Sequence, residues 1–129
     1  MNTQEKIISF IQFQLPALAW CLFIYIASSI PMAKLPPLEN YSDKVVHASV
    51  FAVLCWLMHV ALYHQGIRSI KKYSLWIAVC FVLIYGISDE YHQLFTPGRS
   101  TDPYDVAADL FGGLLYASIN MRYKFYRNE

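Results

Sequence analysis

The chain has few charged side chains and few of the sequence patterns that mark known enzyme classes. Only 15% of its 129 residues are charged and 57% are hydrophobic, whereas a soluble domain has about 25% charged residues. The net charge is +1, and there is no basic patch with interleaved aromatic side chains, so we expect no nucleic-acid partner. This composition is typical of a single integral membrane domain.

Several catalytic motifs are absent as well. The sequence contains no P-loop, no GxSxG and no HExxH. The three cysteines include no CxxC pair, which favours small apolar side chains over a redox or metal role. A hydrolase that uses Ser100 as its nucleophile therefore has no support, and the sequence leaves open whether the protein is an enzyme.

Four apolar segments predict four membrane-spanning helices, at about residues 7–30, 44–63, 73–94 and 103–121. A helix needs about 20 apolar residues to cross some 30 Å of hydrocarbon. We therefore expect an all-α fold, an integral membrane bundle of four transmembrane helices that forms one domain over residues 1–129.

The first segment has two interpretations. It is interrupted by Gln12, Gln14 and Pro16, and its apolar part is short, while residues 27–29 (Ala-Ser-Ser) resemble a signal-peptidase site. A cleaved signal peptide is therefore an alternative. We favour a retained helix, because the segment is long when its first turns are counted and because Pro16 is tolerated at a kink or near a helix start.

Turn and cap residues separate the other segments. The proline-rich residues 31–37 predict an extended linker, and Ser42 and Asp43 offer N-caps for the second helix. Residues 97–98 (Pro-Gly) end the third helix, and Asp102 is suited to cap the fourth.

The distribution of Lys and Arg predicts the orientation in the membrane. Basic residues are more frequent in cytoplasmic loops, and they favour cytoplasmic N- and C-termini in the inner membrane, with most acidic residues on the extracytoplasmic side. The inner side would hold Lys6, Arg68, Lys71, Lys72, Arg122, Lys124 and Arg127, and the outer side Lys34, Lys44 and Arg99.

The acidic residues recur at helical spacing near the predicted outer ends of three helices. Residues four apart share a helix face, as do Asp43 and His47, and also Asp105 and Asp109. Small residues at positions 108, 112 and 113, and Gly86 on the third helix, would let these helices approach closely. We expect the three helix ends to converge on one polar cavity, lined by Asp43, His47, Asp89, Glu90, Gln93, Arg99, Asp105 and Asp109.

These residue types suggest acid–base chemistry or ion binding. Neighbouring carboxylates repel and can prepare a proton donor, so Asp89, Glu90 and His47 are the candidate catalytic groups. Arg99 suits an anionic head group. The remaining candidates for substrate binding are Gln93, Asp43, Asp105 and Asp109.

Each candidate also has a structural interpretation. The acids could form a hydrogen-bond network that ties the helices together, and Arg99 could form a salt bridge with Glu90, Asp102 or Asp105. A divalent metal is a further hypothesis: carboxylates alone would suit Mg²⁺ or Ca²⁺, and His47 or His92 as a ligand would favour zinc. Otherwise His92 is expected at the membrane boundary, and His59 in a structural role.

Three fragments resemble the VanZ-like family of small bacterial membrane proteins. They are DKVVH at Asp43–His47, YGISDEYHQLFTPGRS at Tyr85–Ser100, and D followed by AADLFGG over Asp105–Gly113. The family pattern usually has Asn where this chain has Asp109. The resemblance implies an envelope-associated membrane protein, and the founding member is linked to resistance to the lipoglycopeptide teicoplanin. It implies no particular reaction.

The sequence and the resemblance together suggest three functions that can be tested. The first is action on a lipid-linked or lipophilic envelope molecule at the outer membrane boundary, among membrane lipids. The second is a non-catalytic module that sequesters or excludes a lipophilic ligand, such as a lipoglycopeptide, or assists another membrane protein. The third, an ion pathway, is disfavoured because acids are missing from the inner halves of the helices. Because four short helices form only a thin bundle, we also expect two copies of the chain to associate as a homodimer.

Overall fold

The computed structural model describes residues 2–35 and 40–127, and these residues form helices joined by turns and irregular segments, with no strand among them. The all-α prediction is therefore confirmed for the described part of the chain. Its elements are α1 (Thr3–Ser9), the π-helix η1 (Phe10–Gln14), α2 (Leu15–Ser28), the 3₁₀-helix η2 (Met32–Lys34), α3 (Asn40–Tyr63), α4 (Arg68–Gln93) and α5 (Pro103–Arg127).

Three helical stretches are long and apolar enough to cross a membrane. They are Thr3–Ser28, which joins α1, η1 and α2, then Ser42–Tyr63 and Arg68–Gln93. α5 is as long, with 25 residues, or about 37 Å at 1.5 Å per residue. Its middle is interrupted by Asp109, two glycines and Asn120, and it is not among these candidates. Of the four predicted spans, three thus have the length and composition of membrane helices.

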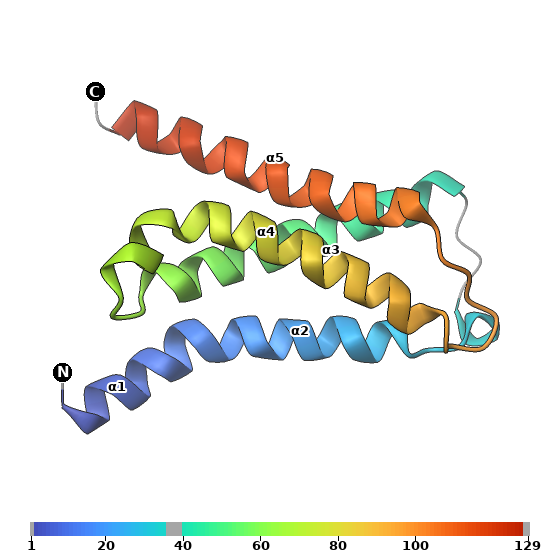
Figure 1. Ribbon diagram of the computed structural model, residues 1–129, viewed down its shortest axis with the longest axis horizontal. Coiled ribbons are helices and arrows are strands. Elements are labelled where there is room, and N and C mark those ends of the chain that lie inside the picture. Colours follow the sequence, from blue (N-terminus) through green and yellow to red (C-terminus); the bar gives the residue numbers. More distant parts are fainter. Residues whose placement is uncertain (1, 36–39, 128–129) are drawn as a thin grey trace.

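The first helix is bent where Pro16 interrupts it. A proline has no N–H to donate to the residue four positions earlier. Just before Pro16 the chain forms η1, in which the N–H of Leu15 donates to the carbonyl of Phe10 in the wider π pattern. Figure 1 shows α1 turned away from the axis of α2 at this point. The kink expected at Pro16 is present, and the helix begins at Thr3 rather than at residue 7.

The other three helices are longer than predicted. α3 begins at Asn40, so Ser42 and Asp43 lie inside the helix and the prediction that they cap it was wrong. α4 begins at Arg68 rather than 73, and α5 continues past residue 121 to Arg127. Basic and polar residues at these ends remain helical because propensity tolerates them where no proline or glycine stops the helix. Part of the predicted linker is a 3₁₀ turn, η2, and residues 36–37 lie outside the described residues.

α3, α4 and α5 pack against one another around a small apolar core, and α2 lies beside α3 and α4. The core contains Phe51, Leu54 and Val82, all nearly inaccessible to solvent. Gly112 permits the closest approach, because a Cβ there would lie 2.0 Å from the carbonyl oxygen of Ala48 on α3. Gly86 similarly faces Asp109 across the contact between α4 and α5. The predicted convergence of these helices through small residues is confirmed.

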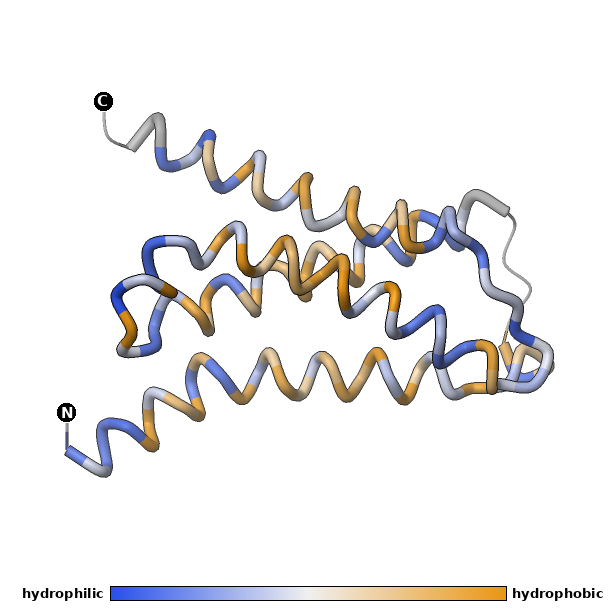
Figure 2. Tube along the Cα trace, in the orientation of Figure 1, coloured by the Kyte–Doolittle hydropathy of each residue, from blue (hydrophilic) through white to orange (hydrophobic). Residues whose placement is uncertain are grey.

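The polar residues gather at the two ends of the bundle. Figure 1 places both termini and the turn between α3 and α4 at one end, and the α2–α3 and α4–α5 connections at the other. Figure 2 shows hydrophilic residues at both ends and a more hydrophobic middle. We call the end with the α2–α3 and α4–α5 connections the loop end. The first turns of α3 and α5 and the last turn of α4 lie there, which brings their acidic residues together.

Candidate functional site

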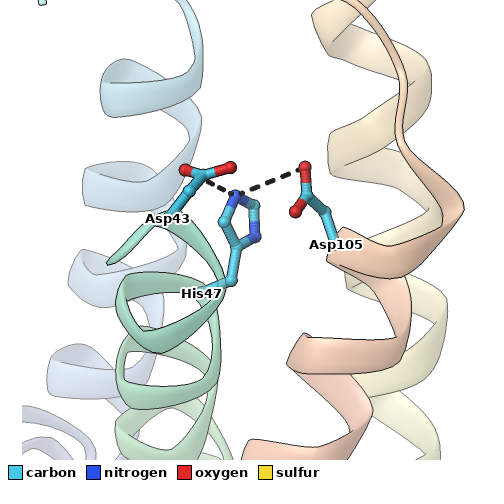
Figure 3. A group of neighbouring side chains, drawn as sticks. All are labelled: Asp43, His47 and Asp105. Carbon is cyan, nitrogen blue, oxygen red and sulfur yellow. Dashed lines mark ion pairs between the residues drawn. The ribbon is translucent and has the colours of Figure 1, made fainter. Parts of the chain in front are cut away.

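The first turns of α3 and α5 bring one histidine and two carboxylates together at the loop end. The His47 Nε2 atom lies 4.0 Å from Asp43 Oδ1 on the same helix and 3.9 Å from Asp105 Oδ2 on α5. Figure 3 shows the three side chains pointing into the space between the two helices. One ligand atom from each lies within 4.8 Å of the others. The predicted Asp43–His47 pair is thus joined by Asp105 from α5.

A buried carboxylate fixes the ring of His47 from behind. The His47 Nδ1 atom lies 2.9 Å from Asp109 Oδ1, and Asp109 is only 1% exposed. An ionised carboxylate can only accept a hydrogen bond, so Nδ1–H donates to Asp109. Nε2 is then the ring nitrogen that faces Asp43 and Asp105. The sequence placed Asp109 in the cluster, and the structure identifies it as the partner that orients His47.

Lys44 is a cation of the site that the sequence analysis did not identify. Its Nζ atom donates to Asp102 Oδ2 at 2.5 Å and to Asp105 Oδ1, and lies 3.8 Å from Asp43 Oδ2. The Lys44 ammonium holds the pKa of the Asp102 carboxyl below its usual range, and the backbone N–H of Tyr104 adds to this effect. Lys44 follows Asp43 directly in the sequence, but its partners lie more than 50 residues later, so spacing gave no indication of the pairing.

The last turn of α4 contributes two carboxylates in different environments. Gln93 Nε2 donates to Asp89 Oδ2 at 3.1 Å, which confirms that these residues share a helix face. Glu90 Oε2 accepts the backbone N–H of Asp102 at 2.8 Å. The other oxygen, Glu90 Oε1, is buried and has no hydrogen-bond partner among the described residues. Glu90 thereby joins α4 to the start of α5.

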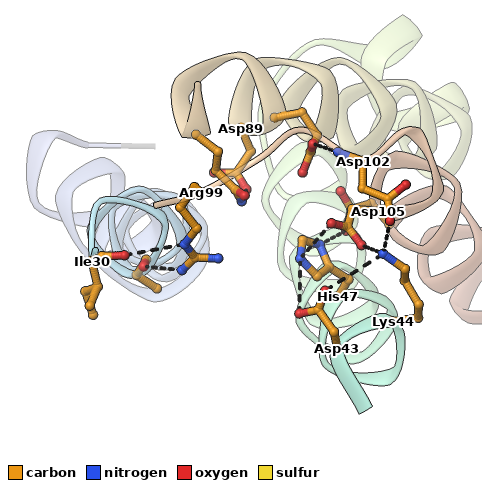
Figure 4. Close-up of polar contacts among 12 residues, drawn as sticks. Ile30, Asp43, Lys44, His47, Asp89, Arg99, Asp102 and Asp105 are labelled. Atoms are coloured by element: carbon orange, nitrogen blue, oxygen red, sulfur yellow. Dashed lines mark hydrogen bonds and ion pairs between the residues drawn. The ribbon is translucent and has the colours of Figure 1, made fainter. Parts of the chain in front are cut away.

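Arg99 lies apart from the carboxylates of α3 and α5. Its Nε atom donates to the carbonyl of Ile30 and its Nη2 atom to the carbonyl of Ala27, both at 3.4 Å. Figure 4 shows Arg99 next to Ile30, across a gap from His47 and Lys44. The alternative expected for Arg99, a salt bridge to Glu90, Asp102 or Asp105, does not appear among the described contacts. The guanidinium instead satisfies carbonyls at the end of α2, where backbone oxygens lack helical partners.

A cavity of about 810 Å³ at the loop end joins these groups. Asp43, His47, Asp89, Gln93, Arg99 and Asp105 line it together with Lys44 and Asp102. The described lining does not include Glu90 or Asp109, which lie behind it, 6% and 1% exposed. Apolar side chains also line the cavity, among them Phe23, Ile24, Val46, Val50 and Phe51.

The remaining histidines lie outside this cavity. His92 Nε2 is 2.9 Å from Ser29 Oγ, and its ring stacks on Tyr25 at 4.5 Å. His59 is 6% exposed, and its Nδ1 atom lies 2.7 Å from the Tyr116 hydroxyl. Both contacts tie parts of the bundle together, as expected of His59 in a structural role.

A family model described as VanZ/LLP1 matches residues 4–123, nearly the whole chain. The chain belongs to the VanZ/LLP1 family. The predicted resemblance is thus confirmed, and with the three apolar helices it makes the chain a membrane protein of that family. No curated protein matches the chain, and no solved structure does either.

The geometry defines what this VanZ/LLP1 protein can do chemically. The cavity lining combines hydrogen-bond acceptors, two basic side chains and apolar side chains, which is the chemistry of a site for an amphipathic molecule. His47 could take a proton at Nε2 with Asp109 stabilising the resulting cation. The same nitrogen, with Asp43 and Asp105, could instead bind a metal ion.

Proposed function

We propose that the protein binds an anionic, lipid-linked molecule of the cell envelope, with its head group in the loop-end cavity and its lipid chain against α2 and α3. The observation that carries this proposal is the cavity's lining, which combines charged and apolar side chains. Phe23 and Val46 are apolar lining residues and are 50% and 47% exposed. Since both border the cavity and the outer surface, a lipid chain can enter between their helices.

Arg99 is the group best placed to recognise the anionic head. Its long 3.4 Å bonds to two carbonyls position the guanidinium on the cavity wall, and an Arg has five N–H donors. Planar guanidinium groups bind phosphate or carboxylate through paired hydrogen bonds. Asp89, with Gln93 beside it, lines the same cavity and is available to contact hydroxyl or amide groups of the ligand.

We place the cavity on the extracytoplasmic face of the inner membrane. The loop end has fewer Lys and Arg residues than the end that holds both termini and the α3–α4 turn. By the positive-inside rule the latter end is cytoplasmic. The founding member of the VanZ-like family is linked to teicoplanin resistance, and teicoplanin is itself an amphipathic molecule directed at the envelope. We therefore also propose that this protein affects susceptibility to teicoplanin.

Binding of a polyprenyl phosphate to the full-length protein in nanodiscs tests the proposal. We expect Arg99→Gln to weaken binding at least about tenfold, because a hydrogen bond to a charged group contributes about 1.5–3 kcal/mol. The matched control is Arg68→Gln, at the opposite end of α4, which should bind as the unmodified protein does. If both variants bind the lipid equally well and unfold at the same temperature as the unmodified protein, Arg99 does not recognise the head group.

A non-catalytic binding module is the second candidate, and Glu90 favours it. Its carboxylate is buried behind the cavity and accepts a backbone N–H, so it has no described access to a bound molecule. On this account Glu90→Gln keeps ligand binding and any teicoplanin phenotype, and the ligand is recovered unchanged. Loss of the phenotype in a folded Glu90→Gln protein, together with a modified ligand in the unmodified protein, would favour catalysis.

A further inference from the structure

We propose that Asp43, His47 and Asp105 bind one divalent transition-metal ion, for which Zn²⁺ is the best-fitting cation. Each residue offers one ligand atom, all within 4.8 Å of one another. Asp43 and His47 come from successive turns of α3, and Asp105 from the first turn of α5 (Figure 3). This inference deepens the proposed function, since it adds a cation to the same cavity.

The distances and ligand types favour zinc over harder cations. Zinc bonds to nitrogen and carboxylate oxygen are about 2.0–2.2 Å long, so tetrahedral ligand atoms lie roughly 3.4 Å apart. The His47 Nε2 atom is 4.0 Å from Asp43 Oδ1 and 3.9 Å from Asp105 Oδ2. Zinc binding would shorten the two His47 distances by about 0.5 Å and would also draw together the two carboxylates, whose ligand atoms lie within 4.8 Å of each other. An imidazole ligand selects zinc and related ions, whereas Mg²⁺ and Ca²⁺ prefer oxygen alone.

The support behind His47 is an observation independent of the acidic ligands. Histidines that bind metals usually donate their second ring N–H to a carboxylate, which fixes the tautomer and orientation. His47 Nδ1 makes this contact with Asp109 Oδ1 at 2.9 Å, and Asp109 is 1% exposed. Since Nδ1 is engaged, Nε2 is the nitrogen that faces Asp43 and Asp105. Asp109 lies outside the ligand set and acts as a positioning residue.

Unpartnered buried oxygens provide a second independent observation. Glu90 Oε1 and Asp109 Oδ2 are buried without hydrogen-bond partners among the described residues. Burying unpaired carboxylate oxygens is unfavourable unless the surroundings supply positive charge. Asp109 contacts His47 directly, and Glu90 accepts the backbone N–H of Asp102, three residues before Asp105. A cation held by His47 and its two ligand partners would offset this excess of negative charge.

Lys44 does not occupy the same positions as the ion. It contacts Asp102 Oδ2 and Asp105 Oδ1, whereas the atom of Asp105 that faces His47 is Oδ2. The ammonium pairs with Asp102 and with one oxygen each of Asp105 and Asp43, so the ion would use the other oxygens, Asp105 Oδ2 and Asp43 Oδ1, and share these carboxylates with Lys44. All three ligands line the cavity, so a remaining coordination position faces it, where the anionic head of a bound lipid can reach.

Metal titration of the full-length protein tests the site directly. The protein is purified in detergent without a histidine tag, stripped with a chelator, and titrated with Zn²⁺ alone by calorimetry. We expect one ion per chain, and binding at least tenfold weaker in Asp43→Asn and in His47→Gln. Replacing Asp109 with Leu should weaken binding about 10–100-fold, as for other residues that orient ligands, whereas Asp109→Asn keeps an oxygen that accepts from His47.

His64→Gln is the matched control, because His64 is an exposed histidine at the opposite end of α3. Asp43 is 37% exposed in its side chain, so Asp43→Asn remains informative if a His47 variant fails to fold. The proposal is overturned if the folded protein binds no stoichiometric Zn²⁺, or if His64→Gln loses as much affinity as Asp43→Asn. Because no lipid is present, either result is separate from the outcome of the Arg99 experiment.

Discussion

Replacing Gly112 with Ala should damage both the stability of the bundle and the geometry of the site. The added Cβ would lie 2.0 Å from the carbonyl oxygen of Ala48 and 2.8 Å from its carbonyl carbon. Carbon–oxygen contacts of this kind are normally about 3.3 Å or longer, so α3 and α5 would have to separate by about 1.3 Å. Backbone atoms at the contact cannot rotate away as a side chain can.

We expect Gly112→Ala to lower the free energy of unfolding by about 1–3 kcal/mol, the usual cost of overpacking. Because Ala48 follows His47, the same separation would lengthen the 2.9 Å contact between His47 and Asp109 beyond hydrogen-bond range. Equilibrium unfolding in mixed micelles, followed by circular dichroism, measures the first effect. Zn²⁺ titration measures the second.

Gly113→Ala is the matched control for this prediction. Its Cβ would meet only a side-chain methyl, Val82 Cγ1, at 3.2 Å, and a shift of a few tenths of an ångström relieves that contact. We expect Gly113→Ala to cost less than about 1 kcal/mol, within the range of tolerated volume changes. The reasoning is refuted if Gly112→Ala is as stable as the unmodified protein, or if Gly113→Ala is the more destabilising of the two.

Two smaller predictions concern hydrogen bonds at the loop end. Thr96→Val removes the hydroxyl that donates to the carbonyl of Ser28 at 3.1 Å in a buried position, and should cost about 1 kcal/mol; Ser118→Ala, at an exposed hydroxyl, should cost little, and equal effects would contradict this account. Asp102→Asn should lower the thermal midpoint at neutral pH. Because pairing with Lys44 lowers the pKa of Asp102 in the folded state, its contribution is present above the ordinary Asp pKa of about 3.9 and is lost as pH falls through the lower folded value. The difference between the two proteins should therefore shrink in acid, and a difference that grew would contradict the pairing.

Helical spacing was sufficient to predict which residues share a helix face. Asp43 with His47 and Asp89 with Gln93 are four residues apart, and both pairs are in contact. The small residues around Gly112 indicated which helices converge. These features depend on a repeat of 3.6 residues, which the sequence displays directly.

Helix rotation and loop paths could not be predicted in the same way. Spacing places Asp89 and Glu90 on adjacent positions, but only packing decides that Asp89 lines the cavity and Glu90 lies behind it. The partners of Lys44 and Arg99 depend on where the α2–α3 and α4–α5 connections run. Contacts between residues so far apart in the sequence leave no periodic pattern.

Site-specific photo-crosslinking tests the proposed ligand position most directly. A photoreactive residue replaces Phe23, which lines the cavity and is half exposed, or Phe111 on α5, which is 61% exposed and is not in the described lining. The proteins are irradiated in membranes that contain a labelled polyprenyl phosphate. We predict strong labelling at position 23 that unlabelled ligand suppresses, with weak labelling at position 111. Equal labelling at both positions, unaffected by competitor, would mean that the lipid contacts the bundle without entering the cavity.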